Sequence, residues 1–308
     1  ASETQIAAFL IALRTKGETV DELTGLARTM RDRATPVRAT RGDLVDTAGT
    51  GGGRSTFNVS TTAALIAAGA GCAVAKHGNR SATSLSGSAD LLEALGARID
   101  LDAGLVGRCI DEVGFGFMFA PAHHRATRFV VPVRKELAVR TIFNFLGPLT
   151  NPAGARRQIV GVADAGFLDT MAGALARLGV ERALVVCGED GVDELSTCAR
   201  TRVVEVNGEQ IDRYHVDPPS LGLRVASPAE VAGGAPEDNA RTTLAILAGE
   251  QGAPRDLAVL NAGAAIYAAG SAVSLAEGIE CACETIDSGN GQRALERYVE
   301  FSRELAAA

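Results

Sequence analysis

The chain has 308 residues and a mass of 31.7 kDa, which is long enough for about two domains of average size. Its 46% hydrophobic and 22% charged residues are typical of a globular protein with a sizeable core, and they exclude disordered and collagen-like chains. The net charge of −7 disfavours a general nucleic-acid binder, because an acidic surface repels the phosphate backbone. Any anionic ligand must therefore be met locally, by loop amides, a few cations or a metal ion.

The sequence carries no sign of a membrane span or of export. Its longest apolar run, Ala63 to Ala75, is shorter than the ~20 residues that cross a bilayer, and no basic and then apolar leader opens the chain. The cysteines match neither a zinc pattern nor a small disulfide-rich framework. We therefore expect free thiols, no membrane partner and a cytoplasmic protein. The cysteines are Cys72, Cys109, Cys187, Cys198, Cys281 and Cys283.

The first residues predict a small all-helical unit. Ser2 with Gln5, and Thr19 with Glu22, form capping-box patterns, and each is followed by apolar residues at helical spacing. We expect a helical domain over residues 1–40, joined by a helical segment near residues 133–146.

From Asp43 onward, short β-rich runs alternate with helical segments, which predicts an α/β domain over residues 41–308 with a mainly parallel sheet and flanking helices. Asn207-Gly208 indicates a β-hairpin, whose His215 we interpret as structural, and the remainder is expected to be helical from Ser227 and Pro228 to the end. The expected parallel strands are 44–47, 72–75, 115–119, 158–162 and 183–187; the hairpin strands are 202–206 and 210–216. Helices are expected after Asn58, after Ser86, over 125–131 and over 165–178.

The loop that follows the first expected strand is rich in glycine. Residues 49–56 read Gly-Thr-Gly-Gly-Gly-Arg-Ser-Thr, directly before a helix that Asn58 opens. Glycines bring backbone N–H groups close to a ligand, and the helix dipole adds attraction for phosphate. The pattern predicts an anion cradle; the alternative is an ordinary tight turn.

The loop after the second strand is polar and basic. Residues 76–84 read Lys-His-Gly-Asn-Arg-Ser-Ala-Thr-Ser, and residues 86–90 begin the next helix. Positive charge with directional hydrogen-bond donors indicates a second phosphate contact.

The third candidate is the adjacent carboxylate pair Asp193 and Glu194, after the strand 183–187. Opposite two phosphate-binding loops, such a pair fits Mg²⁺, which prefers oxygen ligands and is commonly shared with a substrate phosphate. Taken alone, the pair would be read as a solvated helix start.

A fourth segment carries Arg134 and Arg140, followed by a loop with Gly147 and Pro148. An arginine captures a carboxylate through two parallel hydrogen bonds, and the loop could wall one side of a flat apolar ligand. The alternative is that both arginines pair with Glu136 and other surface acids.

In this order, the four segments resemble the anthranilate phosphoribosyltransferases, over essentially the whole chain. The segments concerned are the Gly-Thr-Gly-Gly loop with Asn-Val-Ser-Thr, Lys-His-Gly-Asn-Arg, Arg-Thr-Ile-Phe-Asn to Thr-Asn-Pro, and Val-Asp-Glu-Leu-Ser. The resemblance implies a homodimeric, magnesium-dependent enzyme of tryptophan biosynthesis, which transfers the 5-phosphoribosyl group of phosphoribosyl diphosphate to the amine of anthranilate.

Carried over by position, the resemblance implies Lys76, Asn79 and Arg134 as catalytic residues and Ser60, Asp193 and Glu194 as magnesium ligands. Asn79 and Arg134 would meet anthranilate, while His77, His124 and Pro148 would line its route. The substrate-binding set is Gly49, Gly52, Gly53, Thr56, Asn58, Ser60, Thr61, Lys76, His77, Gly78, Asn79, Arg80, Ser81, Ala82, Thr83, Ser84, Ser88, His124, Arg134 and Pro148.

The chain departs from the family pattern at two places. Gly53 and Arg54 stand where the family has an aspartate in a loop one residue longer, which predicts a new cation beside the diphosphate. Ala138 replaces the usual glycine, which we interpret as a mild change of backbone freedom. Two other functions stay open from the residues: a pyrimidine nucleoside phosphorylase, and a non-catalytic nucleic-acid-binding relative, which the acidic charge disfavours.

Overall fold

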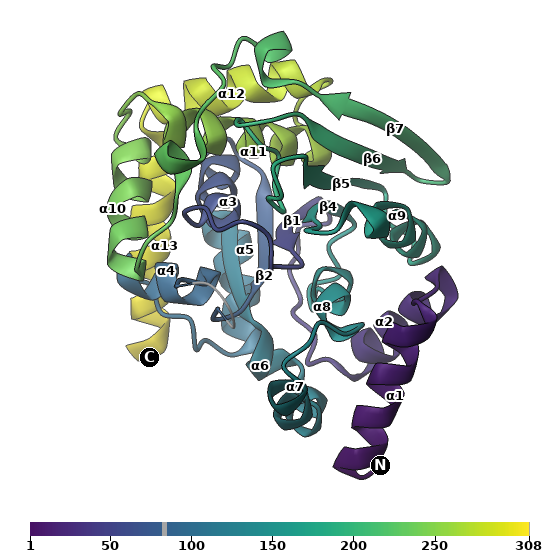
Figure 1. Ribbon diagram of the computed structural model, residues 1–308. Helices are drawn as coiled ribbons and strands as arrows, with labels where there is room; N and C mark the ends of the chain where they lie inside the picture. The colour runs from purple at the N-terminus through teal and green to yellow at the C-terminus, as the bar shows by residue number, and fades with distance from the viewer. Residues whose placement is uncertain (82–84, 308) are drawn as a thin grey trace.

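The computed structural model of the protein describes residues 1–81 and 85–307, and a seven-stranded sheet runs through its larger part (Figure 1). The strand order is β3-β2-β1-β4-β5-β6-β7, in which β1 to β5 are parallel and β6 and β7 form an antiparallel edge. The strands are β1 Leu44–Gly49, β2 Ala73–Gly78, β3 Phe115–Phe119, β4 Arg157–Gly161, β5 Arg182–Gly188, β6 Thr201–Asn207 and β7 Gln210–Val216. The predicted mainly parallel sheet and its hairpin are confirmed.

Helices precede the sheet, connect its strands and follow it. The α-helices are α1 Glu3–Lys16, α2 Val20–Arg33, α3 Val59–Gly69, α4 Ser88–Ala94, α5 Ala103–Val113, α6 Ala120–His123, α7 Val131–Leu137, α8 Phe143–Leu146, α9 Leu168–Arg177, α10 Pro236–Leu247, α11 Ala253–Ala269, α12 Leu275–Asp287 and α13 Asn290–Ala307. Short 3-10 helices are η1 Arg125–Phe129, η2 Gly147–Leu149, η3 Ala165–Phe167, η4 Pro218–Leu221 and η5 Pro228–Val231. None of the described helices has the length and apolar character needed to cross a membrane.

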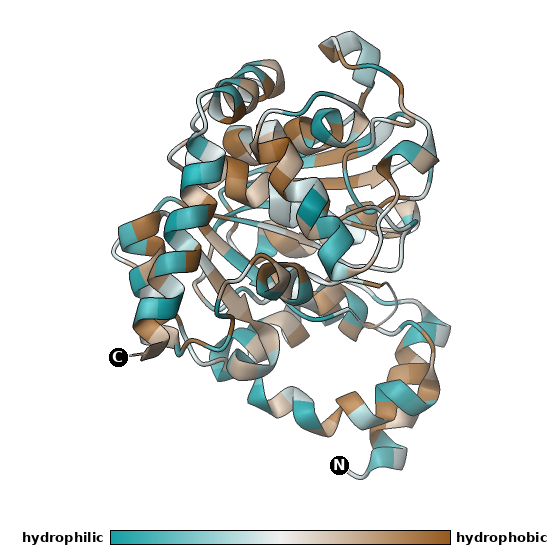
Figure 2. Ribbon diagram, turned by 90° about the vertical axis from the view of Figure 1, so that its left-hand side faces the viewer, coloured by the Kyte–Doolittle hydropathy of each residue, from teal (hydrophilic) through white to brown (hydrophobic). Residues whose placement is uncertain are grey.

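The sheet is covered on both faces because its strands alternate their side chains between two apolar clusters. On β5, Leu184 and Val186 pack with α3 and α11, whereas Ala183 and Val185 pack with α9. This two-residue period, with both faces buried, is what a parallel sheet between helical layers requires. Figure 2 shows the result, with largely apolar strands inside and helices of mixed hydropathy outside.

The N-terminal helices begin where the sequence predicts. Both capping boxes form: the hydroxyls of Ser2 and Thr19 accept from the third helical residue, whose side chain reaches back. The buried Leu10 and Leu23 belong to the same cluster as α8, α9 and one face of the sheet, and α1 contacts α7. The helical unit therefore packs against residues far along the chain; the domain limits of 1–40 and 41–308 stay a prediction.

Three helical expectations need correction. The segment 133–146 is two short helices, because Ala138 adopts a left-handed conformation (φ 50°) that ends α7. Ser227 and Pro228 open only the single 3-10 turn η5, and the long C-terminal helices start at Pro236. The sequence analysis missed α5, although Asp102 caps its start and Gly114 its end.

The topology places a switch point between β1 and β4. The chain builds β1, β2 and β3 outward in one direction and then returns to add β4 and β5 on the other side of β1. Loops that leave β1 and β4 therefore diverge, and ligands of such sheets bind at the carboxyl ends of these strands.

Candidate active site

Asp193 lies directly over this switch point. Gly49 and Gly161 are register partners at the ends of β1 and β4, and a Cβ on Gly49 would lie 2.7 Å from Asp193 Oδ2. A Cβ on Gly161 would overlap the Asp193 carbonyl oxygen. Both strands thus end in glycine because the loop that carries Asp193 folds back onto them, and no side chain fits between.

The loop after β1 and the loop after β5 are in direct contact; we call them the glycine loop (residues 49–56) and the acidic loop (residues 189–196). The Gly51 amide donates to Asp193 Oδ2 at 2.8 Å, and the Arg54 amide donates to the Gly191 carbonyl at 2.7 Å. Gly51 and Gly52 have φ of 65° and 82°, which a residue with a Cβ rarely adopts. The glycines of this loop are therefore required by its conformation.

Lys76 brings β2 to the same place; it lies inside this strand, not in the loop after it as expected, because β2 extends to Gly78. Its side chain is buried, and Nζ donates to the Thr47 carbonyl at 2.5 Å and reaches Ser60 Oγ at 3.4 Å. Burial lowers the pKa of Lys76, whereas the charges of Asp46 and Glu194 act in the opposite direction. The loops after β1 and β5 and the last residues of β2 thus meet around the start of α3.

Asp193 and Glu194 are half-buried and lie outside any helix. The alternative interpretation, in which the pair begins a helix exposed to solvent, is therefore wrong. Burial raises the pKa of Asp193, and burial together with the Asp193 charge raises the pKa of Glu194 to about 8, against the opposing effect of Lys76 and the Ser60 backbone. Two carboxylates that disfavour each other's charge form a site that a cation stabilises.

This donor set fits magnesium shared with a ligand. No group of three or more His, Cys, Asp or Glu side chains suited to a metal occurs in the described part of the chain. Asp193 and Glu194, with Ser60 next to Glu194, would supply hard oxygen ligands but leave coordination positions open, as Mg²⁺ held between one or two carboxylates and a phosphate requires.

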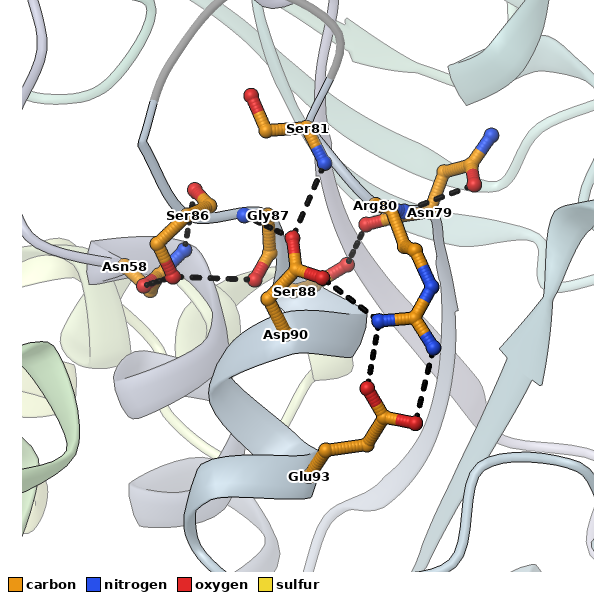
Figure 3. A network of polar contacts seen from close by, with 9 residues as sticks. All are labelled: Asn58, Asn79, Arg80, Ser81, Ser86, Gly87, Ser88, Asp90 and Glu93. Carbon is orange, nitrogen blue, oxygen red and sulfur yellow. Dashed lines mark hydrogen bonds and ion pairs between the residues drawn. The ribbon is translucent and has the colours of Figure 1, made fainter. Parts of the chain in front are cut away.

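An ion-pair network fixes the loop after β2 to α4 (Figure 3). Arg80 donates to Asp90 at 2.8 Å and to both oxygens of Glu93 at 2.5 and 2.9 Å, and Asp90 also accepts from the Ser81 amide at 3.2 Å. Ser88 Oγ donates to the Asn79 carbonyl at 3.2 Å. Ala82, Thr83 and Ser84 lie outside the described residues.

Asn58 precedes α3 without capping it through its side chain. Its amide nitrogen donates to the Ser86 carbonyl at 3.1 Å, and its oxygen accepts from Ser86 Oγ and from Asn239, each at 2.8 Å. Asn58 therefore ties the start of α3 to the loop that precedes α4. Thr56 is half-buried near it, and Thr61 is buried in the first turn of α3.

Arg134 lies on α7 and has no acidic partner among the described residues, so the alternative pairing with Glu136 is not observed there. Its guanidinium lies 5.7 Å from the Phe143 ring centroid, and burial lowers the pKa of Arg134. Arg140 instead donates to the Gly51 carbonyl at 2.8 Å, so it supports the glycine loop. The two arginines therefore belong to different parts of the site.

Three buried histidines, His77, His123 and His124, lie near this segment. The rings of His77 and His124 are 5.1 Å apart, and His77 Nδ1 is 3.2 Å from the Gly147 carbonyl, next to the buried Pro148. Burial, followed by the charge of His124, lowers the pKa of His77 to about 3. The Nε2 atom of each histidine is buried with no partner in the described part of the chain.

The cation that Arg54 adds to the glycine loop is paired within the protein. Its guanidinium donates to Asp190 Oδ2 at 2.5 Å, so the charge is neutralised within the protein. An arginine whose backbone already contacts the acidic loop lies within reach of that loop's carboxylates.

Several residues of the site escaped the sequence analysis. Gly161 makes room for Asp193, and the buried Asp46 accepts from the His77 amide at 3.1 Å and from Asn151 at 2.7 Å. A buried aspartate inside an apolar strand, and an Asn-Pro pair after a polar loop, are signals that could have drawn attention to them.

Comparisons with known proteins agree with this geometry. Residues 41–292 match the model of the glycosyl transferase family a/b domain, and residues 1–34 match that of its helical bundle domain. Two curated relatives are anthranilate phosphoribosyltransferases: the protein of Symbiobacterium thermophilum is 54% identical, with 100% of this chain and 90% of the relative covered. The protein of Rubrobacter xylanophilus is 55% identical, with 99% and 90% covered.

Solved structures give the same family. The crystal structure of anthranilate phosphoribosyltransferase from Thermus thermophilus matches with a TM-score of 0.94 and 49% identity, over 98% of this chain and 91% of that one. The Saccharomyces cerevisiae enzyme in complex with PRPP and Mg matches with a TM-score of 0.90 and 29% identity, over 98% and 86%. Since more than half of its residues are identical to those of two such relatives and its fold matches the solved structures, the chain belongs to the anthranilate phosphoribosyltransferase family.

Proposed function

We propose that the chain transfers the 5-phosphoribosyl group of phosphoribosyl diphosphate to the amine of anthranilate, giving N-(5-phosphoribosyl)anthranilate and diphosphate, in tryptophan biosynthesis. This is the reaction of its family. The observation that carries the assignment to these residues is the meeting of the loops after β1 and β5 with Lys76 of β2 over the switch point. These segments gather backbone donors, a buried lysine and two carboxylates at the carboxyl ends of the strands.

The diphosphate end of the donor is assigned to the glycine loop, Lys76 and the acidic loop. As diphosphate departs, negative charge grows on it, so stabilising the leaving group is the main catalytic task. Asp193, Glu194 and Ser60 would hold magnesium, which when bound neutralises charge on the diphosphate; the yeast relative with PRPP and Mg supports this use. The amides of the glycine loop and Lys76 supply further positive potential.

Anthranilate is assigned to the side of Arg134. Arg134 is half-buried without an acidic partner in the described residues, so its fork of donors is available for the carboxylate. Asn79, exposed at the end of β2, would orient the acceptor. The aromatic amine is already neutral at pH 7, and His77, whose pKa is about 3, stays neutral as well. Positioning, worth up to ~7 to 11 kcal/mol in well-oriented systems, therefore matters more here than a general base.

The test is to mix the protein with Mg²⁺, anthranilate and phosphoribosyl diphosphate and to follow the loss of anthranilate fluorescence. We expect turnover that needs all three components. A parallel assay with inorganic phosphate and a pyrimidine nucleoside should release no base. Phosphate-dependent base release without anthranilate consumption would overturn the assignment in favour of the phosphorylase.

We also infer a homodimer that forms through the helical unit, in the cytoplasm. Phe9 and Ile11 of α1 and Val131 of α7 are exposed apolar residues on neighbouring helices, and all six cysteines are free thiols. Light scattering coupled to size exclusion should give twice the chain mass, and Phe9→Glu should give a monomer.

A further inference from the structure

A salt bridge joins the glycine loop to the acidic loop beside the switch point. Arg54 Nη2 donates to Asp190 Oδ2 at 2.5 Å, and the side chains of the two residues are 26% and 13% exposed. The Arg54 amide also donates to the Gly191 carbonyl at 2.7 Å. Arg54 therefore holds the acidic loop through both its main chain and its side chain, in surroundings where solvent screens the charges little.

The Asp190 end of this pair is itself fixed. Asp190 Oδ2 accepts from Ser196 Oγ at 2.9 Å, and Ser196 Oγ in turn accepts from the Cys198 amide at 2.9 Å. A Cβ on Gly188 would lie 2.5 Å from Asp190 Oδ1. Asp190 is therefore held by Ser196 as well as by Arg54, so a shift of Arg54 would be transmitted to the rest of the acidic loop.

One donor and one acceptor of the pair are unused. Arg54 Nε and Asp190 Oδ1 are both buried, and neither has a partner among the described residues. These are the atoms that a two-point arginine–carboxylate pair would join. Joining both atoms takes the planar fork of an arginine, which a lysine lacks.

The Arg54–Asp190 pair lies beside the contact between the glycine loop and the acidic loop, and Asp193 is part of that contact. A Cβ on Gly53 would lie 2.8 Å from Asp193 Oδ1 and 2.9 Å from its amide, so the two loops are at contact distance. We propose that Arg54 is a positioning residue, which acts through Asp190 to hold the acidic loop where Asp193 and Glu194 would hold the magnesium that meets the diphosphate of the donor. The proposal rests on the proposed function and adds a residue to its machinery.

The experiment measures binding of Mg²⁺ with inorganic diphosphate to the full chain by titration calorimetry, alongside the KM of each substrate. Arg54→Gln should weaken diphosphate binding about tenfold and raise the KM for phosphoribosyl diphosphate, with the KM for anthranilate unchanged. Arg54→Lys should fall between Arg54→Gln and wild type. Arg157→Gln is the matched control, because Arg157 has similar exposure (29%) and an ion pair with Glu181, but at the opposite, amino end of the sheet.

A double-mutant cycle separates positioning from direct contact. If Arg54 acts through Asp190, Arg54→Gln should have no further effect on binding in an Asp190→Asn background. Additive losses would overturn the proposal, because they indicate that Arg54 contacts the ligand itself, and so would wild-type affinity in a folded Arg54→Gln. If Arg54→Gln does not fold, Arg54→Lys carries the same test. Failure of the wild-type protein to bind diphosphate would instead overturn the proposed function.

Discussion

The two sides of the site differ in how far the chain itself satisfies their polar groups. On the diphosphate side, Asp193 accepts from Gly51, Lys76 donates to Thr47, and Arg140 donates to the Gly51 carbonyl. On the acceptor side, Arg134 has no acidic partner in the described residues, and the buried histidine Nε2 atoms have none there either. The side proposed for the diphosphate is thus organised in advance by contacts within the chain, although Arg54 Nε, Asp190 Oδ1 and Arg140 Nη2 also lack a partner in the described residues. The side proposed for anthranilate is the more open one, because its cation, Arg134, keeps its charge for a ligand.

The largest effect is expected from the two carboxylates on the side proposed for the diphosphate, Asp193 and Glu194. Replacing Asp193 by Asn and Glu194 by Gln should lower kcat roughly a thousandfold, because the site loses its oxygen ligands for magnesium and the leaving group loses its stabilisation. Kinetics across a magnesium titration would measure this loss. The control is Asp190→Asn, which should keep magnesium-dependent turnover with a weaker donor affinity. A double variant with normal activity would show that magnesium is held elsewhere.

Arg134→Ala tests the open side. We expect the KM for anthranilate to rise about 10- to 100-fold, the cost of losing a charge-assisted hydrogen bond, while the KM for phosphoribosyl diphosphate stays unchanged. Anthranilate methyl ester, which lacks the carboxylate charge, should react equally with variant and wild type. Arg128→Ala is the matched control, since Arg128 is exposed and also lies over an aromatic ring. Equal changes in both KM values would remove the assigned role.

Alanine substitutions at two neighbouring glycines test how much the Arg140 contact contributes to the stability of the glycine loop. Gly51→Ala should cost about 1–2 kcal/mol of unfolding free energy, because the position has a φ of 65° but open space around it. Gly52→Ala should cost about 1 kcal/mol more, since its Cβ would also displace Arg140 from the Gly51 carbonyl. Urea unfolding measures both variants. Equal losses would mean that the Arg140 contact contributes little.

The neutral histidines of the open side predict a pH dependence. The pKa of His77 is about 3 in the folded chain because of burial and the nearby His124, His123 and Lys76, against an ordinary value near 6.5 in the unfolded chain. The unfolded state therefore binds the extra proton first, so this contribution is fully present above pH 6.5 and is lost as the pH falls toward 3. Between pH 7 and pH 5, wild type should lose about 2 kcal/mol more than His77→Gln. Parallel losses in urea unfolding would contradict a buried, neutral His77.

The same comparison explains what could be predicted from the sequence. The strands, the capping boxes and the glycine loop follow local rules of periodicity and backbone conformation, and these elements are found within a few residues of their expected positions. By contrast, the position of Asp193 over Gly161 and the pairing of Arg54 with Asp190 depend on contacts between segments that are distant in the chain. Composition and spacing do not encode such pairs, which is why the pairing of Arg54 with Asp190 was not predicted.

The smallest effect is expected at Ala138, which lies between Arg134 and Arg140 in the chain. Among the described residues it is the one non-glycine residue with positive φ (50°), so the change from glycine is a source of strain rather than the mild difference expected. Ala138→Gly should stabilise the chain by about 0.5–1 kcal/mol, because relief of about 1–2 kcal/mol of left-handed strain exceeds the extra entropy of glycine in the unfolded state. Ala8→Gly, at an exposed position inside α1, should instead destabilise it by about 1 kcal/mol. Urea unfolding of both variants gives opposite signs if Ala138 is strained, and the same sign if it is not.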